Sequence, residues 1–169
     1  VVVGAVDLAG GPENVLLRNQ LAKINTGVHT LSFDQNANGW IPGEGAGVVV
    51  LKRLDTAKQE QNRIYAVIDA ISLVQDTQKR SHPTKDETAS PLPNSQAVTR
   101  ACQQAYQLAG IQPPDIGYLE VCGSGVPQED KSEIRGLVEA YRTSNLDLSC
   151  AIGSVKANIG HTYVASGIA

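Results

Sequence analysis

Residues 152–161, which read IGSVKANIGH, say more about this chain than any other stretch. They place one basic residue, Lys156, and one imidazole, His161, on the two sides of a short turn that contains Gly160. A histidine held at the end of a strand can donate a hydrogen bond to a carbonyl oxygen on which negative charge develops. The stretch therefore predicts either a site of carbonyl chemistry or a structural histidine with its hydrogen bonds satisfied inside the protein.

A second tight turn is expected earlier in the chain, at residues 122–127, CGSGVP. It follows the apolar run of residues 116–121, which has the pattern of a strand. Ser124 lies between two glycines, but Cys122 stands where a nucleophile elbow requires glycine two residues before its serine. The turn therefore does not predict a serine hydrolase.

The other candidate groups have plainer explanations. The segment from Gly43 to Gly47 fits neither glycine-rich phosphate-loop pattern, so we expect a tight structural bend there. Asp130 and Glu133 lie near the start of a predicted helix, where carboxylates stabilise the helix dipole at least as readily as they act in catalysis. We expect no chemical role for the remaining histidines and cysteines, which are His29, His82, Cys102 and Cys150.

Composition narrows the classes of protein that fit. The chain has 169 residues, of which 41% are hydrophobic, enough for the core of one domain. Its net charge of −3 does not predict the basic surface that binds nucleic acid or an anionic membrane. No apolar run approaches the ~20 residues of a spanning helix, and there is no secretory signal. The three cysteines include no C-x-x-C pair, so we expect a reduced, cytoplasmic protein without a metal site.

The start and the end of the chain are unusual for a whole domain. The sequence contains no methionine and begins directly in an apolar run, VVVGAV. Domains ordinarily begin and end at polar surface. We therefore expect this chain to be a piece cut from a longer one.

Apolar patterning predicts alternating strands and helices. Strands are expected at residues 1–6 (in a parallel sheet), after the glycine-rich bend within 40–54, and at 64–74, 116–121 and 150–155. Helices are expected at 13–23, 95–109 and 129–142 and from about 162. Asn94 is the expected N-cap of the second helix and Gly110 its stop, whereas the proline-containing residues 76–94 are expected to form a loop.

Five blocks, in order, resemble the later part of a β-ketoacyl synthase, the condensing-enzyme domain of fatty acid and polyketide synthases. Phe33 to Lys52 resembles the family's block that runs from F-D through G-E-G to L-K. Shorter matches occur at residues 75–76 and 93–94. Glu120 to Pro127 is similar to E-A-H-G-T-G-T-P, and Gly153 to His161 is similar to G-S-V-K-S-N-I-G-H. The similarity covers essentially all 169 residues.

The resemblance implies an α/β fold of the thiolase-like, layered αβαβα type, present here incompletely. On this pattern residues 1–75 hold the end of the N-terminal half and the start of the C-terminal half. Residues 76–94 form a loop, and residues 95–169 hold βα units of the C-terminal half.

The resemblance also implies a chemistry. In the family a cysteine nucleophile carries the acyl chain, and two histidines bind the thioester carbonyl of a malonyl unit and stabilise the enolate formed on decarboxylation. His161 matches the second histidine, Lys156 matches the lysine of that motif, and Cys122 stands at the first-histidine position. The family pattern implies no cofactor of the chain's own, because the acyl group arrives on the phosphopantetheine arm of an acyl carrier protein.

Two departures limit what the chain is expected to do. The family's nucleophile motif does not occur in it, so we expect this piece alone to be inactive. A thiol at Cys122 is a weak hydrogen-bond donor, and loss of one oxyanion donor typically costs about 10²–10³ in rate. Pro42 and Lys131 also depart from the family pattern, which has arginine and proline there.

Three readings of the parent protein remain open. It is a degenerate ketosynthase-like domain, such as a chain-length factor or a domain of a polyunsaturated fatty acid synthase; or an active ketosynthase or acyltransferase that tolerates Cys122; or a non-catalytic interaction and dimerisation scaffold. For the first two, the expected partners are an acyl carrier protein, a ketosynthase-type dimer partner and other synthase domains, with no nucleic acid and no membrane.

Overall fold

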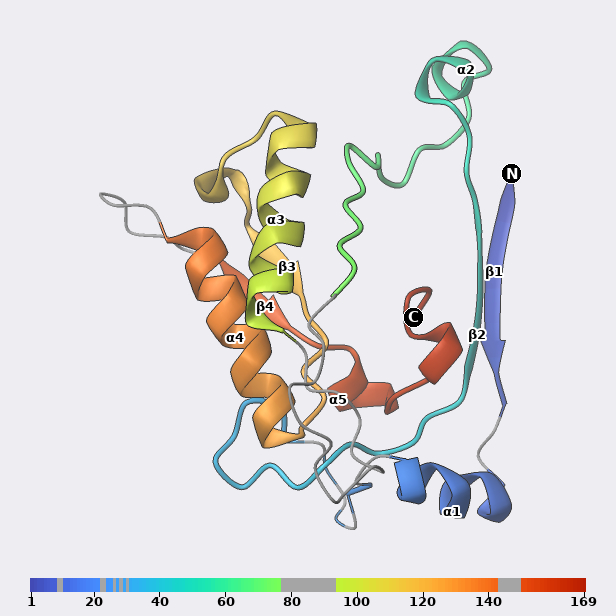
Figure 1. Ribbon diagram of the computed structural model, residues 1–169. Helices are drawn as coiled ribbons and strands as arrows, with labels where there is room; N and C mark the ends of the chain where they lie inside the picture. Colours follow the sequence, from blue (N-terminus) through green and yellow to red (C-terminus); the bar gives the residue numbers. More distant parts are fainter. Residues whose placement is uncertain are drawn as a thin grey trace.

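The computed structural model describes residues 1–8, 11–21, 24–25, 27, 29, 31–76, 94–142 and 150–169. Most of the loop expected at 76–94 lies outside these residues. The described part mixes helices with short strands (Figure 1), which confirms the α/β class. In chain order the elements are β1 (Val2–Asp7), α1 (Pro12–Leu21), β2 (Gly45–Val50), α2 (Leu54–Gln59), α3 (Ser95–Ala109), η1 (Pro113–Asp115), β3 (Tyr118–Glu120), α4 (Pro127–Tyr141), β4 (Ala151–Gly153), α5 (Lys156–Ile159) and η2 (Tyr163–Ala165).

The first strand pairs differently from the prediction. β1 and β2 form an antiparallel ribbon, in register from Val2 opposite Val50 to Asp7 opposite Gly45. The parallel arrangement expected for residues 1–6 is therefore wrong, because an unbroken valine run signals burial on both faces but not the direction of the partner strand. In this chain the opposite residues Val2 and Val50 are 70% and 74% exposed, so the face of the ribbon that carries them is uncovered at its outer end.

The strand expected at residues 64–74 is also wrong. Residues 62–76 have no helix or strand, and Tyr65 and Leu73 are largely exposed. An extended, β-branched sequence becomes a strand only where another backbone is available to pair with it. In the part of the chain that the structure describes, no segment pairs with this one.

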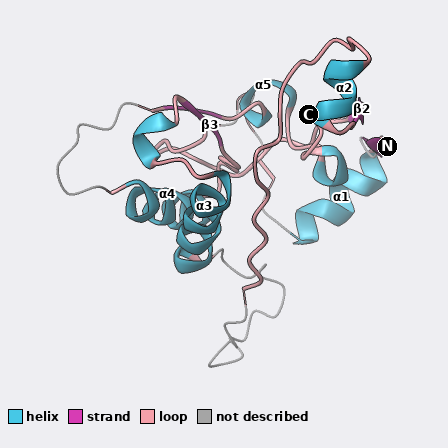
Figure 2. Ribbon diagram, turned by 90° about the horizontal axis from the view of Figure 1, so that it is seen from above, coloured by secondary structure: helices cyan, strands magenta, loops and turns pink. Residues whose placement is uncertain are grey.

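The second half of the chain forms a packed unit. β3 and β4 pair in parallel, and α3 and α4 lie side by side against them (Figure 2). The buried residues of this core are Val121, Leu137, Ala140 and Tyr141. Gly136 lets the two helices approach closely, because a Cβ there would lie 2.6 Å from the Ser95 carbonyl oxygen and 2.7 Å from Val98 Cβ.

The ends of α3 were predicted correctly. The Asn94 side chain accepts a hydrogen bond from the Gln96 amide at 3.0 Å, and Gly110 ends the helix at φ = 70°. Such left-handed C-caps favour glycine because it has no Cβ to clash.

The helix expected from about residue 162 is wrong. The backbone turns at Gly160, with φ = 78°, and again at Tyr163, with φ = 44°, so only α5 and the single turn η2 form. η2 lies against the β1–β2 ribbon, and the side chain of Ile168 fills the space that a Cβ on Gly47 would need. No helix within the described residues has the length and apolarity to cross a membrane.

Candidate functional site

The Cys122 turn lies next to the start of the segment that leads to Lys156 and His161. The Ser154 hydroxyl donates to the carbonyl oxygen of Cys122 at 2.9 Å, and the Val155 amide donates to Glu120 Oε1 at 2.7 Å. The chain then enters α5 at Lys156. The parallel pairing of β3 with β4 produces this arrangement, because the carboxyl ends of both strands lie at the same edge of the sheet.

The backbone of His161 is fixed by a segment from the first half of the chain. Its amide donates to the Ile41 carbonyl at 2.7 Å, and its own carbonyl accepts from the Gly43 amide at 2.9 Å. Gly43 is required at this contact, because a Cβ there would collide with the Ile159 carbonyl oxygen and lie 3.0 Å from the Gly160 carbonyl carbon. The tight bend predicted at Gly43–Gly47 is therefore wrong, because Gly45 and Gly47 lie in the extended strand β2. The segment is structural, and Gly43 supports the backbone of the candidate histidine.

The ring of His161 is oriented by a neighbouring amide. The Tyr163 amide donates to His161 Nδ1 at 3.0 Å, so Nδ1 is the acceptor and the neutral ring carries its proton on Nε2. The Trp40 ring lies beside the imidazole, with 5.0 Å between the ring centroids. Burial lowers the pKa of His161, and the positive charges of Lys156 and Arg18 lower it further. This histidine is therefore held neutral, with one N–H able to donate.

Cys122 presents a different group at the neighbouring turn. The residue is exposed at the surface of this chain, and partial desolvation of its thiol raises the pKa. The negative charge of Glu133 raises that pKa further, while Lys156 opposes it. The side chain is thus a neutral thiol at physiological pH, which is a weak hydrogen-bond donor.

Sequence reasoning underestimated Asp130 and Glu133, called here the carboxylate pair. Glu133 accepts from the amides of Cys122 and Gly123 at 2.7 and 2.9 Å. Asp130 is 4% exposed and accepts from the Phe33 amide at 2.8 Å and from the Gly125 amide at 3.2 Å. The sequence does indicate that both side chains lie on one face of α4, because they are three residues apart. It does not indicate that they bind the backbone amides of the preceding turn.

The remaining candidates lie elsewhere. Cys102 and Cys150 pack against the core between α3, α4 and the β3–β4 pair. The carbonyl of His29 accepts from the Asn25 side chain at 2.7 Å, and His82 lies outside the described residues. Within the described ranges, no three histidine, cysteine, aspartate or glutamate side chains are grouped as a metal site would require.

Comparison with known families matches almost the whole chain. The N-terminal domain model of β-ketoacyl synthase matches residues 1–57, and the C-terminal domain model matches residues 65–169. This chain belongs to the β-ketoacyl synthase family.

Curated relatives of this β-ketoacyl synthase chain are multidomain synthases. It is 36% identical to the polyketide synthase PksL of Bacillus subtilis (strain 168) over 99% of its length. It is 32% identical to 6-methylsalicylic acid synthase of Penicillium expansum, again over 99% of its length. The chain spans only 4% and 9% of these two relatives.

Solved ketosynthase domains share the fold. The ketosynthase from module 6 of the bacillaene synthase of Bacillus subtilis 168 is 34% identical, with a TM-score of 0.85, over 99% of this chain and 29% of that one. An oxazolomycin ketosynthase domain of Streptomyces albus JA3453 is 32% identical, with a TM-score of 0.85, over 98% and 28%. The ishigamide ketosynthase/chain length factor is 26% identical, with a TM-score of 0.77, over 98% and 37%. The thiolase-like fold class is thereby confirmed, and the chain corresponds to part of a ketosynthase domain.

Proposed function

We propose that this chain supplies the carbonyl-binding side of a ketosynthase site in a polyketide synthase, and that Cys122 impairs this site in decarboxylative condensation. One observation carries the proposal. The Tyr163 amide occupies His161 Nδ1, which leaves Nε2–H free to donate, whereas the neighbouring Cys122 offers only a neutral thiol.

The proposed chemistry follows from these groups. A malonyl thioester on the phosphopantetheine arm of an acyl carrier protein loses CO₂, and the bonding electron pair moves onto the thioester oxygen as an enolate. His161 donates Nε2–H to that oxygen, and the positive charge of Lys156 stabilises the negative charge that develops. The enolate carbon then attacks the acyl thioester of the upstream nucleophile, and the thiolate of that nucleophile leaves. A second strong donor is missing at Cys122, which we expect to slow decarboxylation by about 10²–10³-fold.

The hydrogen bonds that hold the Cys122 turn favour a second candidate function. Although the donor at this turn is a thiol, the carboxylate pair still holds the turn through the amides of Cys122, Gly123 and Gly125. A preserved backbone at this position is compatible with acyl transfer that requires no enolate. The parent domain would then accept and pass on an acyl chain without extending it.

One experiment separates these functions. The ketosynthase domain that contains this chain is incubated with an acyl thioester, and acyl-enzyme is detected by intact mass. CO₂ release from a malonyl carrier-protein thioester is then measured for the domain as it stands, for Cys122→His and for Cys122→Ala as the matched control. We expect Cys122→His to raise CO₂ release at least tenfold and Cys122→Ala to leave it unchanged.

The outcomes are distinct. Acyl loading with slow CO₂ release supports the acyl-transfer function, and no loading by a folded domain supports a non-catalytic partner such as a chain-length factor. Condensation at full rate without any change at Cys122 would overturn the proposed impairment. The acyl carrier protein, the dimer partner, the absence of a cofactor and a cytoplasmic location belong to this proposal as well.

A further inference from the structure

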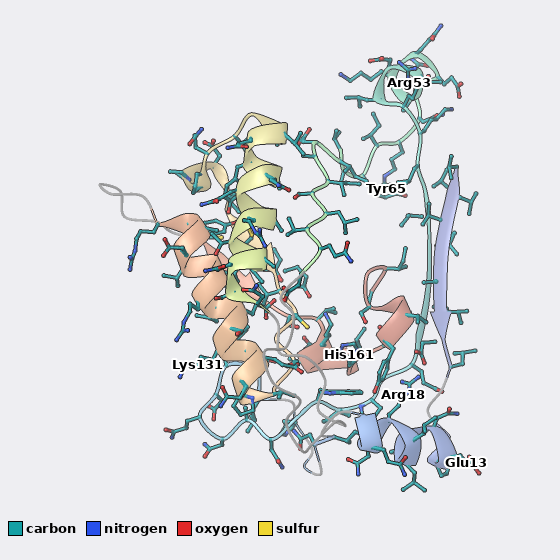
Figure 3. The ribbon with its side chains drawn as sticks, viewed as in Figure 1. Glu13, Arg18, Arg53, Tyr65, Lys131 and His161 are labelled. Carbon is teal, nitrogen blue, oxygen red and sulfur yellow. The ribbon has the colours of Figure 1, made fainter. Side chains whose placement is uncertain are left out.

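A row of side chains runs from His161 to the first strand and helix of the chain. The Tyr163 ring packs edge-on against Trp40, with 4.7 Å between the centroids. On the Tyr163 ring lies the guanidinium of Arg18, whose Cζ is 3.6 Å from the ring centroid. Arg18 Nη2 in turn donates to both oxygens of Asp7, at 2.9 and 3.1 Å. In Figure 3 Arg18 rises from α1 toward the segment that carries His161.

Tyr163 joins this row to the imidazole in two ways. Its amide donates to His161 Nδ1 at 3.0 Å, and its ring centroid lies 5.1 Å from that of His161. The amide points at the imidazole from a residue at φ = 44°, a left-handed backbone that a bulky side chain rarely adopts. Such a conformation persists only where the surroundings over-determine it. The contacts of the Tyr163 ring with Trp40 and Arg18 stabilise this backbone conformation.

We propose that Tyr163 is a positioning residue for His161, and that Trp40 and Arg18 hold it in this role by packing on its ring. The ring contacts keep the strained backbone in place, the backbone keeps the amide on Nδ1, and the amide leaves the proton on Nε2. The inference deepens the proposed function, because it explains how the donor nitrogen is selected. It predicts that the ring and the backbone of Tyr163 matter, while its hydroxyl, which has no hydrogen-bond partner among the described residues, does not.

The charges around His161 come from three elements. Lys156 belongs to α5, Arg18 to α1 and Asp7 to β1. Lys156 and Arg18 lower the pKa of His161, whereas Asp7 acts in the opposite direction and more weakly than Arg18. A variant that tests the packing of Arg18 on the Tyr163 ring must therefore keep the positive charge at position 18.

The test measures the protonation of His161 directly and does not depend on catalytic activity of the synthase. The ketosynthase domain that contains this chain is treated with diethyl pyrocarbonate at a series of pH values, and carbethoxylation of the His161 peptide is quantified by mass spectrometry. Because only the neutral imidazole reacts, the midpoint of the pH profile reports its protonation. The same profile is recorded for Tyr163→Gly, Tyr163→Phe and Val164→Gly.

Tyr163→Gly permits the left-handed backbone but removes the ring. We expect its midpoint to move to higher pH, because the amide at position 163 is no longer held on Nδ1, which is left to water and to the Ser166 hydroxyl 3.5 Å away. Tyr163→Phe keeps the ring and is expected to match the parent domain. Val164→Gly, at an exposed residue of the same turn, controls for added backbone freedom and is also expected to leave the midpoint unchanged.

Two results would overturn the proposal. One is an unchanged midpoint in a folded Tyr163→Gly protein, and the other is an equal shift in Tyr163→Phe, which would assign the effect to the hydroxyl. If Tyr163→Gly does not fold, Arg18→Lys decides. It keeps the positive charge and the Tyr163 backbone but removes the planar guanidinium from the Tyr163 ring, and we expect its midpoint to rise; an unchanged midpoint there overturns the role of Arg18. A domain that never releases CO₂ still gives these readings, so failure of the proposed function is seen separately.

Discussion

The turn at Cys122 and the turn at His161 are held in place by different means. Side-chain carboxylates of α4 hold the first, through the amides of Cys122 and Gly123. Backbone pairing with a distant segment holds the second, through Ile41 and Gly43. Both supports are intact, yet only the His161 turn presents a strong hydrogen-bond donor. Hydrogen bonds that hold a turn in place are therefore no evidence that the turn can act in catalysis. The stability of each turn and its chemical role need separate tests.

The largest expected effect tests the chemical side of this comparison. In a Cys122→His background, His161→Ala should reduce CO₂ release from a malonyl thioester by about 10²–10³-fold, because one of two enolate donors is lost. His29→Ala in the same background is the control and should have no effect. If CO₂ release falls by less than tenfold, His161 does not act as an enolate donor, and the prediction is wrong.

The next effect tests the support of the Cys122 turn. Glu133→Gln should lower the free energy of unfolding by about 1–3 kcal/mol, because an amide cannot accept from both the Cys122 and Gly123 amides as a carboxylate does. Urea unfolding of the ketosynthase domain measures it. Glu139→Gln, on the exposed side of the same helix, is the matched control, and equal losses in the two variants would contradict the prediction.

A smaller effect concerns the reactivity of the thiol. Since partial desolvation and the negative charge of Glu133 raise the pKa of Cys122, its alkylation by iodoacetamide near pH 8 should be slower than that of a free cysteine. Glu133→Gln removes the largest of the negative charges that raise this pKa and should accelerate the reaction a few-fold, as read from the Cys122 peptide by mass spectrometry. Fast alkylation of the unaltered protein would show that the thiolate forms readily.

The smallest expected effect is a pH dependence that belongs to the His161 turn. The folded protein lowers the pKa of His161 below its ordinary value of 6.5, so the unfolded chain takes up the proton first on acidification. Stability should therefore fall as the pH drops below about 6.5, and His161→Gln should make that fall shallower. Melting temperatures between pH 5 and 8 measure the difference, and an identical pH dependence would refute it.

Local signals in the sequence predicted local structure well. The capping residues Asn94 and Gly110 define α3 because each satisfies backbone groups within its own helix end. The two turns and their residues Cys122, Lys156 and His161 were found from glycine spacing and from family resemblance. Their roles in catalysis stay predictions.

Features that depend on distant partners were missed. The antiparallel pairing of β1, the amides that the carboxylate pair binds, and the bridge from Ile41 to His161 all join segments that the sequence does not relate to each other. The left-handed backbone of Tyr163 was missed for a related reason, because residue type alone disfavours it and only the packing of its ring accounts for it.

The hydrogen bond from the His161 amide to the Ile41 carbonyl also has a kinetic consequence. It closes a loop of about 120 residues, and contacts at such separation form late because the chain must first lose the entropy of closing that loop. The β3–β4 unit with α3 and α4 can assemble beforehand from nearer neighbours. During refolding, protection of the Val121 amide should therefore precede protection of the His161 amide, and the donor nitrogen would acquire its orientation among the last events of folding.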